Sequence, residues 1–247
     1  MGGSNMNGIV HLLDYGYNMA DYSIFIAGAN QGQRVKIPVM GCYIDHPEAK
    51  IVVDTGVSDP KAPGAVDCQH VHTEKQTPLE QLKKLGVKPE EIKYLVITHL
   101  HYDHAGAMNL FPNAKVIVRR EELKEAYVPM AKDDINYYRP DFDRKDVNYD
   151  LIPNGLDIEL ADGITVLSVP GHTVGTQCVV IKTSEGPVIY AADSVYWYKN
   201  WEENKLPGIL YSAEKFDMSI AKMKAIRGGI LIPGHEPTLD LNRVYGK

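Results

Sequence analysis

A run of potential metal ligands directly after a predicted buried strand constrains this chain more than any other feature. The apolar segment Lys93–Thr98 reads as that strand. The imidazoles of His99 and His101 follow, and in an extended backbone they point to the same side. Asp103 and His104 stand where a helix would begin, so four nitrogen and oxygen donors can face one small volume. Neutral imidazoles and carboxylates in this combination suit zinc or a similar divalent cation.

A chance cluster of surface histidines explains this run poorly. The chain has 9 histidines among 247 residues. Three of them at this fixed spacing would occur by chance in about one such chain in a hundred, even before Asp103 is required. We therefore interpret the run as half of a metal site.

Three further donors follow β-like runs elsewhere in the chain. His172 and His235 each stand in a Pro-Gly-His turn after such a run, and Asp193 ends a third run. Functional side chains are often carried by loops that a rigid scaffold positions. Each of these positions alone is more often a solvated turn residue or a cap. Together with the first cluster they are the expected remaining ligands.

The ordered set resembles the motif of the metallo-β-lactamase superfamily, a His-x-His-x-Asp-His run followed by a distant His, a distant Asp and a last His. Asp54-Thr55-Gly56 is similar to that family's early strand-end motif. The resemblance covers most of the chain. It implies an α/β (α+β) fold, an αββα sandwich in a single domain, with two metals at one edge between the sheets.

The resemblance also implies a role for each donor. The first metal is expected to bind His99, His101 and His172. The second is expected to bind Asp103, His104 and His235, and Asp193 is expected to bind both. Asp54 is expected to orient a ligand histidine from behind. The two ions are expected to be zinc, or other divalent metals such as iron, manganese or cobalt.

Several branches of this family fit the sequence poorly. True β-lactamases often carry a cysteine where Asp193 stands, and their motif ends in arginine where this chain has His104. Glyoxalase II-type thioesterases carry a helical glutathione-binding extension, whereas only 12 residues follow His235 here. Nucleic-acid branches usually add domains and basic surfaces, but the net charge of this chain is −6.

What remains resembles the N-acyl homoserine lactonases and their lactonase relatives. The segment Ile37–Ile44, the aromatic Tyr102 inside the motif, and Tyr196 three residues after Asp193 are all similar to theirs. In that family a tyrosine at this position reaches the substrate carbonyl. The resemblance therefore implies an ester-hydrolysing lactonase acting on a small molecule.

The expected mechanism has two catalytic side chains beside the metals. A metal-bridging hydroxide would attack the lactone carbonyl, Tyr196 would donate a hydrogen bond to the developing oxyanion, and Asp103 would carry a proton to the leaving alkoxide. The alternatives are another hydrolase of the same fold, acting on a thioester, phosphodiester or β-lactam, and a non-catalytic metal-binding member. The complete ligand set argues against the last.

The remaining segments predict an ordinary mixed fold. The expected strands are Ile9–Leu13, Tyr22–Ile26, Val35–Ile44, Lys50–Asp54, Lys93–Thr98, Lys115–Val118, Ile164–Val169, Cys178–Lys182, Val188–Ala192 and Ile230–Ile232, and the expected helices are Pro78–Leu85, Glu121–Tyr127 and Ala213–Ile226. Lys61–Thr77 reads as an exposed loop with solvated His70 and His72. The alternative for these two histidines is a role in a substrate pocket. Val128–Gly155 reads as a surface excursion, and the sequence leaves open whether it is a lid or a dimer contact.

Composition adds a cellular expectation. Three cysteines with irregular spacing read as reduced thiols, and no apolar run is long enough to span a bilayer, so we expect a cytoplasmic protein that binds neither membrane nor nucleic acid. A homodimer is left open. Residues 1–7 are expected to be a tag remnant or disordered start, and residues 8–247 to form one hydrolase domain.

Overall fold

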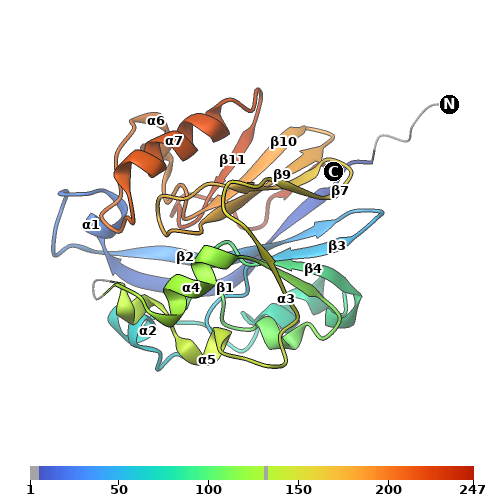
Figure 1. Cartoon of the computed structure of the whole chain (residues 1–247), viewed down its shortest axis with the longest axis horizontal. Helices are drawn as coiled ribbons and strands as arrows, with labels where there is room; N and C mark the ends of the chain where they lie inside the picture. The colour runs from blue at the N-terminus through green and yellow to red at the C-terminus, as the bar shows by residue number, and fades with distance from the viewer. Residues whose placement is uncertain (1–5, 131–132) are drawn as a thin grey trace.

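Two β-sheets pack face to face and carry helices on their outer surfaces (Figure 1). The computed structural model describes residues 6–130 and 133–247. Part of the expected tag remnant, residues 1–5, and two residues of the predicted excursion, 131 and 132, therefore lie outside the described residues. The predicted αββα sandwich is confirmed.

The first sheet holds seven strands among the described residues. In spatial order they are β12 (Val244–Tyr245), β1 (Ile9–Asp21), β2 (Arg34–Asp45), β3 (Lys50–Val53), β4 (Ile92–Val96), β5 (Lys115–Arg119) and β6 (Tyr149–Ile152). Strands β12, β1, β2 and β3 are antiparallel, whereas β3, β4, β5 and β6 are parallel. Parallel neighbours need a crossover between them, and helices α3 and α4 lie in these crossovers.

The second sheet holds five strands in the described part of the chain. In spatial order they are β11 (Ile230–Pro233), β10 (Gly186–Ala192), β9 (Gln177–Thr183), β8 (Ile164–Ser168) and β7 (Ile158–Ala161). Its pairs are antiparallel except for β10 and β11, which are parallel and are joined through helix α7.

Helices cover both outer faces. The described helices are α1 (Tyr22–Phe25), α2 (Pro63–Asp67), α3 (Pro78–Lys84), α4 (Arg120–Tyr127), α5 (Arg139–Phe142), α6 (Tyr198–Glu202) and α7 (Ala213–Lys224), with short 3-10 turns at η1 (Pro89–Glu91), η2 (Met108–Leu110) and η3 (Asp134–Asn136). Figure 1 shows α6 and α7 over the second sheet, and α3, α4 and α5 beyond the first. None of these helices is long and apolar enough to cross a bilayer.

The core lies in three layers because the central strands are buried on both faces. In β3, Val53 faces the second sheet and packs with Val179 and Ile232, whereas Val52 faces the helices and packs with Leu82 of α3. Successive side chains of a strand point to opposite faces, so an unbroken run of β-branched residues fills two layers at once. A third cluster lies beneath α7.

Three expectations about local structure were wrong. The predicted strand Tyr22–Ile26 is instead the helix α1, because Asp21 caps it by accepting a hydrogen bond from the backbone amide of Ser23. The predicted loop Lys61–Thr77 contains α2, and its two histidines are half-buried rather than solvated. The predicted excursion contains α5 and the edge strand β6.

Candidate metal centre

Seven candidate ligands lie together where four strands end. The first histidine loop (98–106) follows β4, the second histidine loop (170–176) follows β8, and the other two donors follow β10 and β11. The structure brings together and buries all seven: His99, His101, Asp103, His104, His172, Asp193 and His235. Both sheets therefore contribute to one site.

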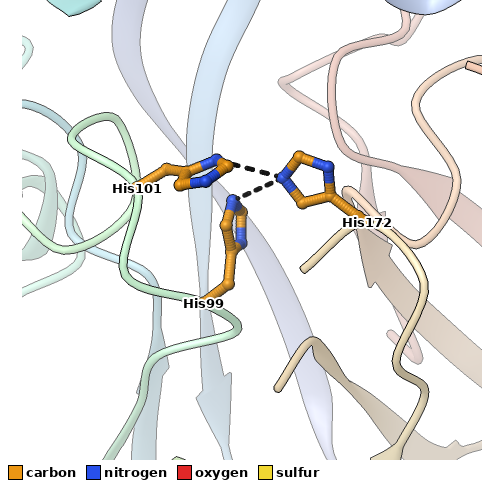
Figure 2. A group of neighbouring side chains, drawn as sticks. All are labelled: His99, His101 and His172. Carbon is orange, nitrogen blue, oxygen red and sulfur yellow. Dashed lines mark hydrogen bonds between the residues drawn. The ribbon is translucent and has the colours of Figure 1, made fainter. Parts of the chain in front are cut away.

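Three imidazoles form the first half of the centre. His172 Nε2 lies 3.1 Å from His99 Nε2 and 3.1 Å from His101 Nδ1. Figure 2 shows His99 and His101 on one loop and His172 facing them from another. A tetrahedral zinc ion with bonds of about 2.05 Å would hold its ligand atoms roughly 3.3 Å apart, close to this spacing. Burial lowers the pKa of each of these three rings below its usual value, so the neutral, ligand-competent form is favoured.

Asp103, His104 and His235 form the second half. Their candidate ligand atoms all lie within 4.8 Å of one another. Burial lowers the pKa of His104, but the carboxylates of Asp193, Asp54 and Asp103 outweigh it and raise that pKa well above its usual value. This half of the centre therefore favours an added positive charge.

Asp193 faces both halves with different oxygen atoms. Its Oδ2 lies 3.4 Å from His172 Nε2, while its Oδ1 lies 3.1 Å from His235 Nε2 and 3.3 Å from His104 Nε2. His104 Nε2 and Asp193 Oδ1 are buried without a hydrogen-bond partner. Two cations bridged by Asp193 would satisfy these atoms, so the residues present fit a dinuclear metal site.

Contacts behind the ligands fix which ring nitrogen faces the site. Asp54 Oδ2 lies 2.8 Å from His104 Nδ1, and the same carboxylate accepts hydrogen bonds from the amide and hydroxyl of Thr98. His235 Nδ1 donates to the carbonyl of Pro38 at 2.8 Å. With Nδ1 occupied, Nε2 of each ring is free for a metal. Asp54 thus lies where its predicted orienting role requires.

Tyr196 also reaches the centre. Its hydroxyl oxygen lies 3.0 Å from His172 Nδ1, and its ring stacks against His235. Burial, reinforced by Asp193, raises the pKa of Tyr196 well above its usual value, so the phenol keeps its proton.

The sequence did not indicate Glu122, which ties the two histidine loops together. This fully buried carboxylate accepts hydrogen bonds from Leu100 N and Tyr137 OH with Oε1, and from Thr173 Oγ1 and Gly175 N with Oε2. In the sequence it stands in the first turn of a predicted helix, where an acidic residue is ordinary. No local signal separates it from an exposed glutamate.

The predicted excursion packs against the site as well. The ring of Tyr137 lies 4.8 Å from that of His101, and the amide of Tyr102 donates to the carbonyl of Asn136. The described part of this segment therefore covers the first histidine loop. A role of this segment as a lid and its role as a dimer contact are both still predictions.

Comparison with known proteins identifies relatives of this chain. A protein of Rhizobium johnstonii named N-acyl homoserine lactonase AttM is 33% identical over 227 residues, which cover 84% of this chain and 86% of the relative. A crystal structure of a variant of Bacillus thuringiensis AiiA with N-decanoyl-L-homoserine at its active site matches with a TM-score of 0.83 and 26% identity, covering 94% of both chains. An N-acyl homoserine lactone hydrolase with the product N-hexanoyl-L-homoserine at its catalytic metal centre matches equally well, with a TM-score of 0.83 and 26% identity over 94% of both chains.

A family model described as the metallo-beta-lactamase superfamily matches residues 42–235, a span that includes every candidate ligand. The resemblance predicted from the motif is confirmed, and the chain belongs to the metallo-beta-lactamase superfamily.

Proposed function

We propose that this protein is a dinuclear metal-dependent hydrolase that opens the ring of N-acyl homoserine lactones or similar lactones. The observation that carries the proposal is the placement of Asp193, with one oxygen toward each half of the centre and Tyr196 beside it. The relatives named N-acyl homoserine lactonase support the choice of substrate class.

The residues of the centre would hold two zinc ions, or iron, manganese or cobalt, since imidazoles and carboxylates suit all four. The proposed ligands are His99, His101 and His172 for one ion, Asp103, His104 and His235 for the other, and Asp193 for both. When bound, such ions polarise a carbonyl and activate water at neutral pH.

Tyr196 would donate a hydrogen bond to the developing oxyanion. Because His172 Nε2 faces the other imidazoles, its Nδ1 carries the ring proton and donates a hydrogen bond to the Tyr196 oxygen at 3.0 Å. The phenolic proton stays available for the substrate. A well-placed donor of this kind contributes about 3 kcal/mol to transition-state stability.

Asp103 would serve the leaving group. Ring opening breaks the bond between the acyl carbon and the ring oxygen, and the alkoxide released needs one proton. The buried carboxylate of Asp103 lies in the half of the centre with His104 and His235 and can pass a proton from the attacking water to that oxygen. The product is the open hydroxy acid.

The cavity beside the centre suits a substrate with a polar head and an apolar tail. The polar residues that line it include Asn18, Tyr102 and Asp103. The apolar residues that line it are Ala20, Ile24, Phe25, Ile37 and Ile209. A lactone ring would face the polar residues beside the centre, and an acyl chain would bury apolar surface against the apolar residues.

A substrate panel with metal analysis on the same sample tests the proposal. The panel contains acyl homoserine lactones, simple γ- and δ-lactones, a thioester, a phosphodiester and nitrocefin. We expect two metals per chain and opening of the acyl homoserine lactones. Two metals with untouched lactones and turnover of another compound would overturn the proposed substrate and favour the corresponding hydrolase.

A further inference from the structure

We propose that Asn18 is a positioning residue for Asp103, and that His70 and His72 hold Asn18 in place. This inference rests on the dinuclear centre proposed above. Asn18 belongs to β1 and is 1% exposed. Its amide nitrogen Nδ2 lies 3.2 Å from Asp103 Oδ2 and 3.0 Å from the Tyr102 hydroxyl oxygen.

The backbone after α2 brings His70 to this position. Tyr17 and Val71 exchange two hydrogen bonds of 2.9 Å, one in each direction, and so form an antiparallel bridge outside the main sheet. In an antiparallel pair the next residues along each strand, Asn18 and His70, lie opposite each other on one face. The amide of Met19 extends the pairing by donating to a carbonyl near the end of α2.

Gly16 permits this close approach. It sits in the irregularity of β1 between Asp14 and Tyr17, with a φ of +100°. A Cβ atom there would lie 2.3 Å from the carbonyl oxygen of Val71, far inside contact distance. Only glycine combines that φ with that contact.

The direction of each hydrogen bond in the chain follows from Asp103. A metal-binding carboxylate accepts only, so the Asn18 amide nitrogen must face Asp103 and its oxygen Oδ1 must face His70. His70 Nδ1 lies 2.8 Å from that oxygen and therefore donates. His70 Nε2 then has a free lone pair and accepts from His72 Nδ1 at 3.0 Å.

The neutral state that this arrangement requires of His70 fits its surroundings. Burial, reinforced by the neighbouring His72, lowers the pKa of His70 to about 4. At neutral pH the ring thus carries a single proton, at Nδ1, and His70 keeps both of its contacts.

The consequence for the centre is a fixed carboxylate. Three hydrogen bonds in one direction lead from His72 near the surface to Oδ2 of Asp103. They restrict rotation of that carboxylate and leave Oδ1 toward His104 Nε2, 3.7 Å away. An amide N–H is not acidic enough to pass a proton on, so the role of Asn18 is orientation rather than proton transfer.

Variants of the full-length, cobalt-loaded protein test this inference. Asn18→Leu keeps the volume but removes the donor, His70→Leu removes the bond that holds Asn18, and His70→Asn keeps a donor near the position of Nδ1. The measurements are chelator competition for each of the two ions, the visible absorption of bound cobalt, and kcat and KM for the best lactone of the panel.

We expect Asn18→Leu to weaken binding of one ion about 10-fold or more, to change the cobalt spectrum, and to leave the other ion's affinity within about 2-fold. His70→Leu should act in the same direction, His70→Asn should recover most of the loss, and the effect on catalysis should fall on kcat. His11→Leu is the matched control, since His11 is a half-buried histidine on the same strand that contacts Tyr43 rather than the centre.

The outcomes separate this inference from the proposed function. If wild type holds two ions and opens lactones while folded Asn18→Leu shows unchanged ion affinities and spectrum, only the inference is overturned. Equal losses in His70→Asn and His70→Leu would also overturn it, because packing rather than the donor would then be responsible. A wild-type protein that holds fewer than two ions would overturn both.

Discussion

The buried carboxylate of Glu122 offers the sharpest test of how the two histidine loops are held together. Replacing it with glutamine keeps the shape but substitutes an NH₂ group for one oxygen. Each oxygen accepts from one backbone amide, Leu100 N at 3.0 Å for Oε1 and Gly175 N at 3.0 Å for Oε2. Whichever way the glutamine turns, one backbone N–H then faces another N–H and cannot rotate away.

The expected cost follows from these contacts. A buried donor without an acceptor costs about 1–3 kcal/mol, and the neutral amide also accepts more weakly than a carboxylate from the remaining donors. Together these effects should lower the free energy of unfolding of Glu122→Gln by about 3–5 kcal/mol. Both histidine loops depend on this side chain, so metal affinity should fall as well.

Urea unfolding at a fixed free zinc concentration measures the effect. The matched control is Glu214→Gln, an exposed glutamate in the first turn of α7, which should change stability by less than about 0.5 kcal/mol. A difference of about 1 kcal/mol in the free energy of unfolding is the ordinary effect of a point mutation. If Glu122→Gln differs from wild type by no more than that, the reasoning about the two loops is refuted.

Four further changes test other parts of the site and the fold. Tyr196→Phe should keep both metals and lower kcat about 100-fold, and an unchanged kcat would remove the phenol from the mechanism. Asp54→Ala should weaken one metal site about 10- to 100-fold in chelator competition, because His104 loses the 2.8 Å contact at Nδ1; equal affinity would contradict that role. Burial raises the pKa of Asp141 from 3.8 to about 7, so the folded state binds the extra proton between these values and stability falls as pH rises through that window. The side chain of Asp141→Asn cannot ionise. As pH rises to about 7, the free energy of unfolding of this variant should therefore increase relative to that of wild type by roughly 1 kcal/mol per pH unit, measured by denaturant titration. A difference that stays constant with pH would show that the carboxyl is not protonated. Removing metal with a chelator should lower the melting temperature and readded zinc should restore it, since a ligand bound only by the folded state stabilises it; a melting temperature indifferent to metal would contradict the site.

The sequence predicted the parts of the centre that depend on local geometry. His99 and His101 are two residues apart after a strand, and that spacing alone places both rings on one side. Asp193 and His235 could be placed because each follows an apolar run that forms a strand of the second sheet, β10 and β11 respectively. The fold followed from the same motif through the family resemblance.

Residues whose roles depend on tertiary contacts could not be predicted in this way. Asn18 and His70 are 52 positions apart and meet only because the chain after α2 returns to β1. Glu122 acts on loops that are 22 and 51 positions away. At Tyr22–Phe25 the β-forming side chains favoured a strand, but the segment is a helix whose first turn is capped by the carboxylate of Asp21. Strand propensity is therefore a weak signal when packing and caps oppose it.

The pairing of β12 with β1 brings the two ends of the described chain together. Val10 lies opposite Tyr245, so the contact that completes the first sheet closes a loop of more than two hundred residues. Closing so long a loop costs chain entropy that a two-residue strand repays poorly, and β12 should join late in folding. The same proximity means that a short linker between residues 8 and 246 could join the ends, so that new termini can be opened in a surface turn such as the one between β9 and β10.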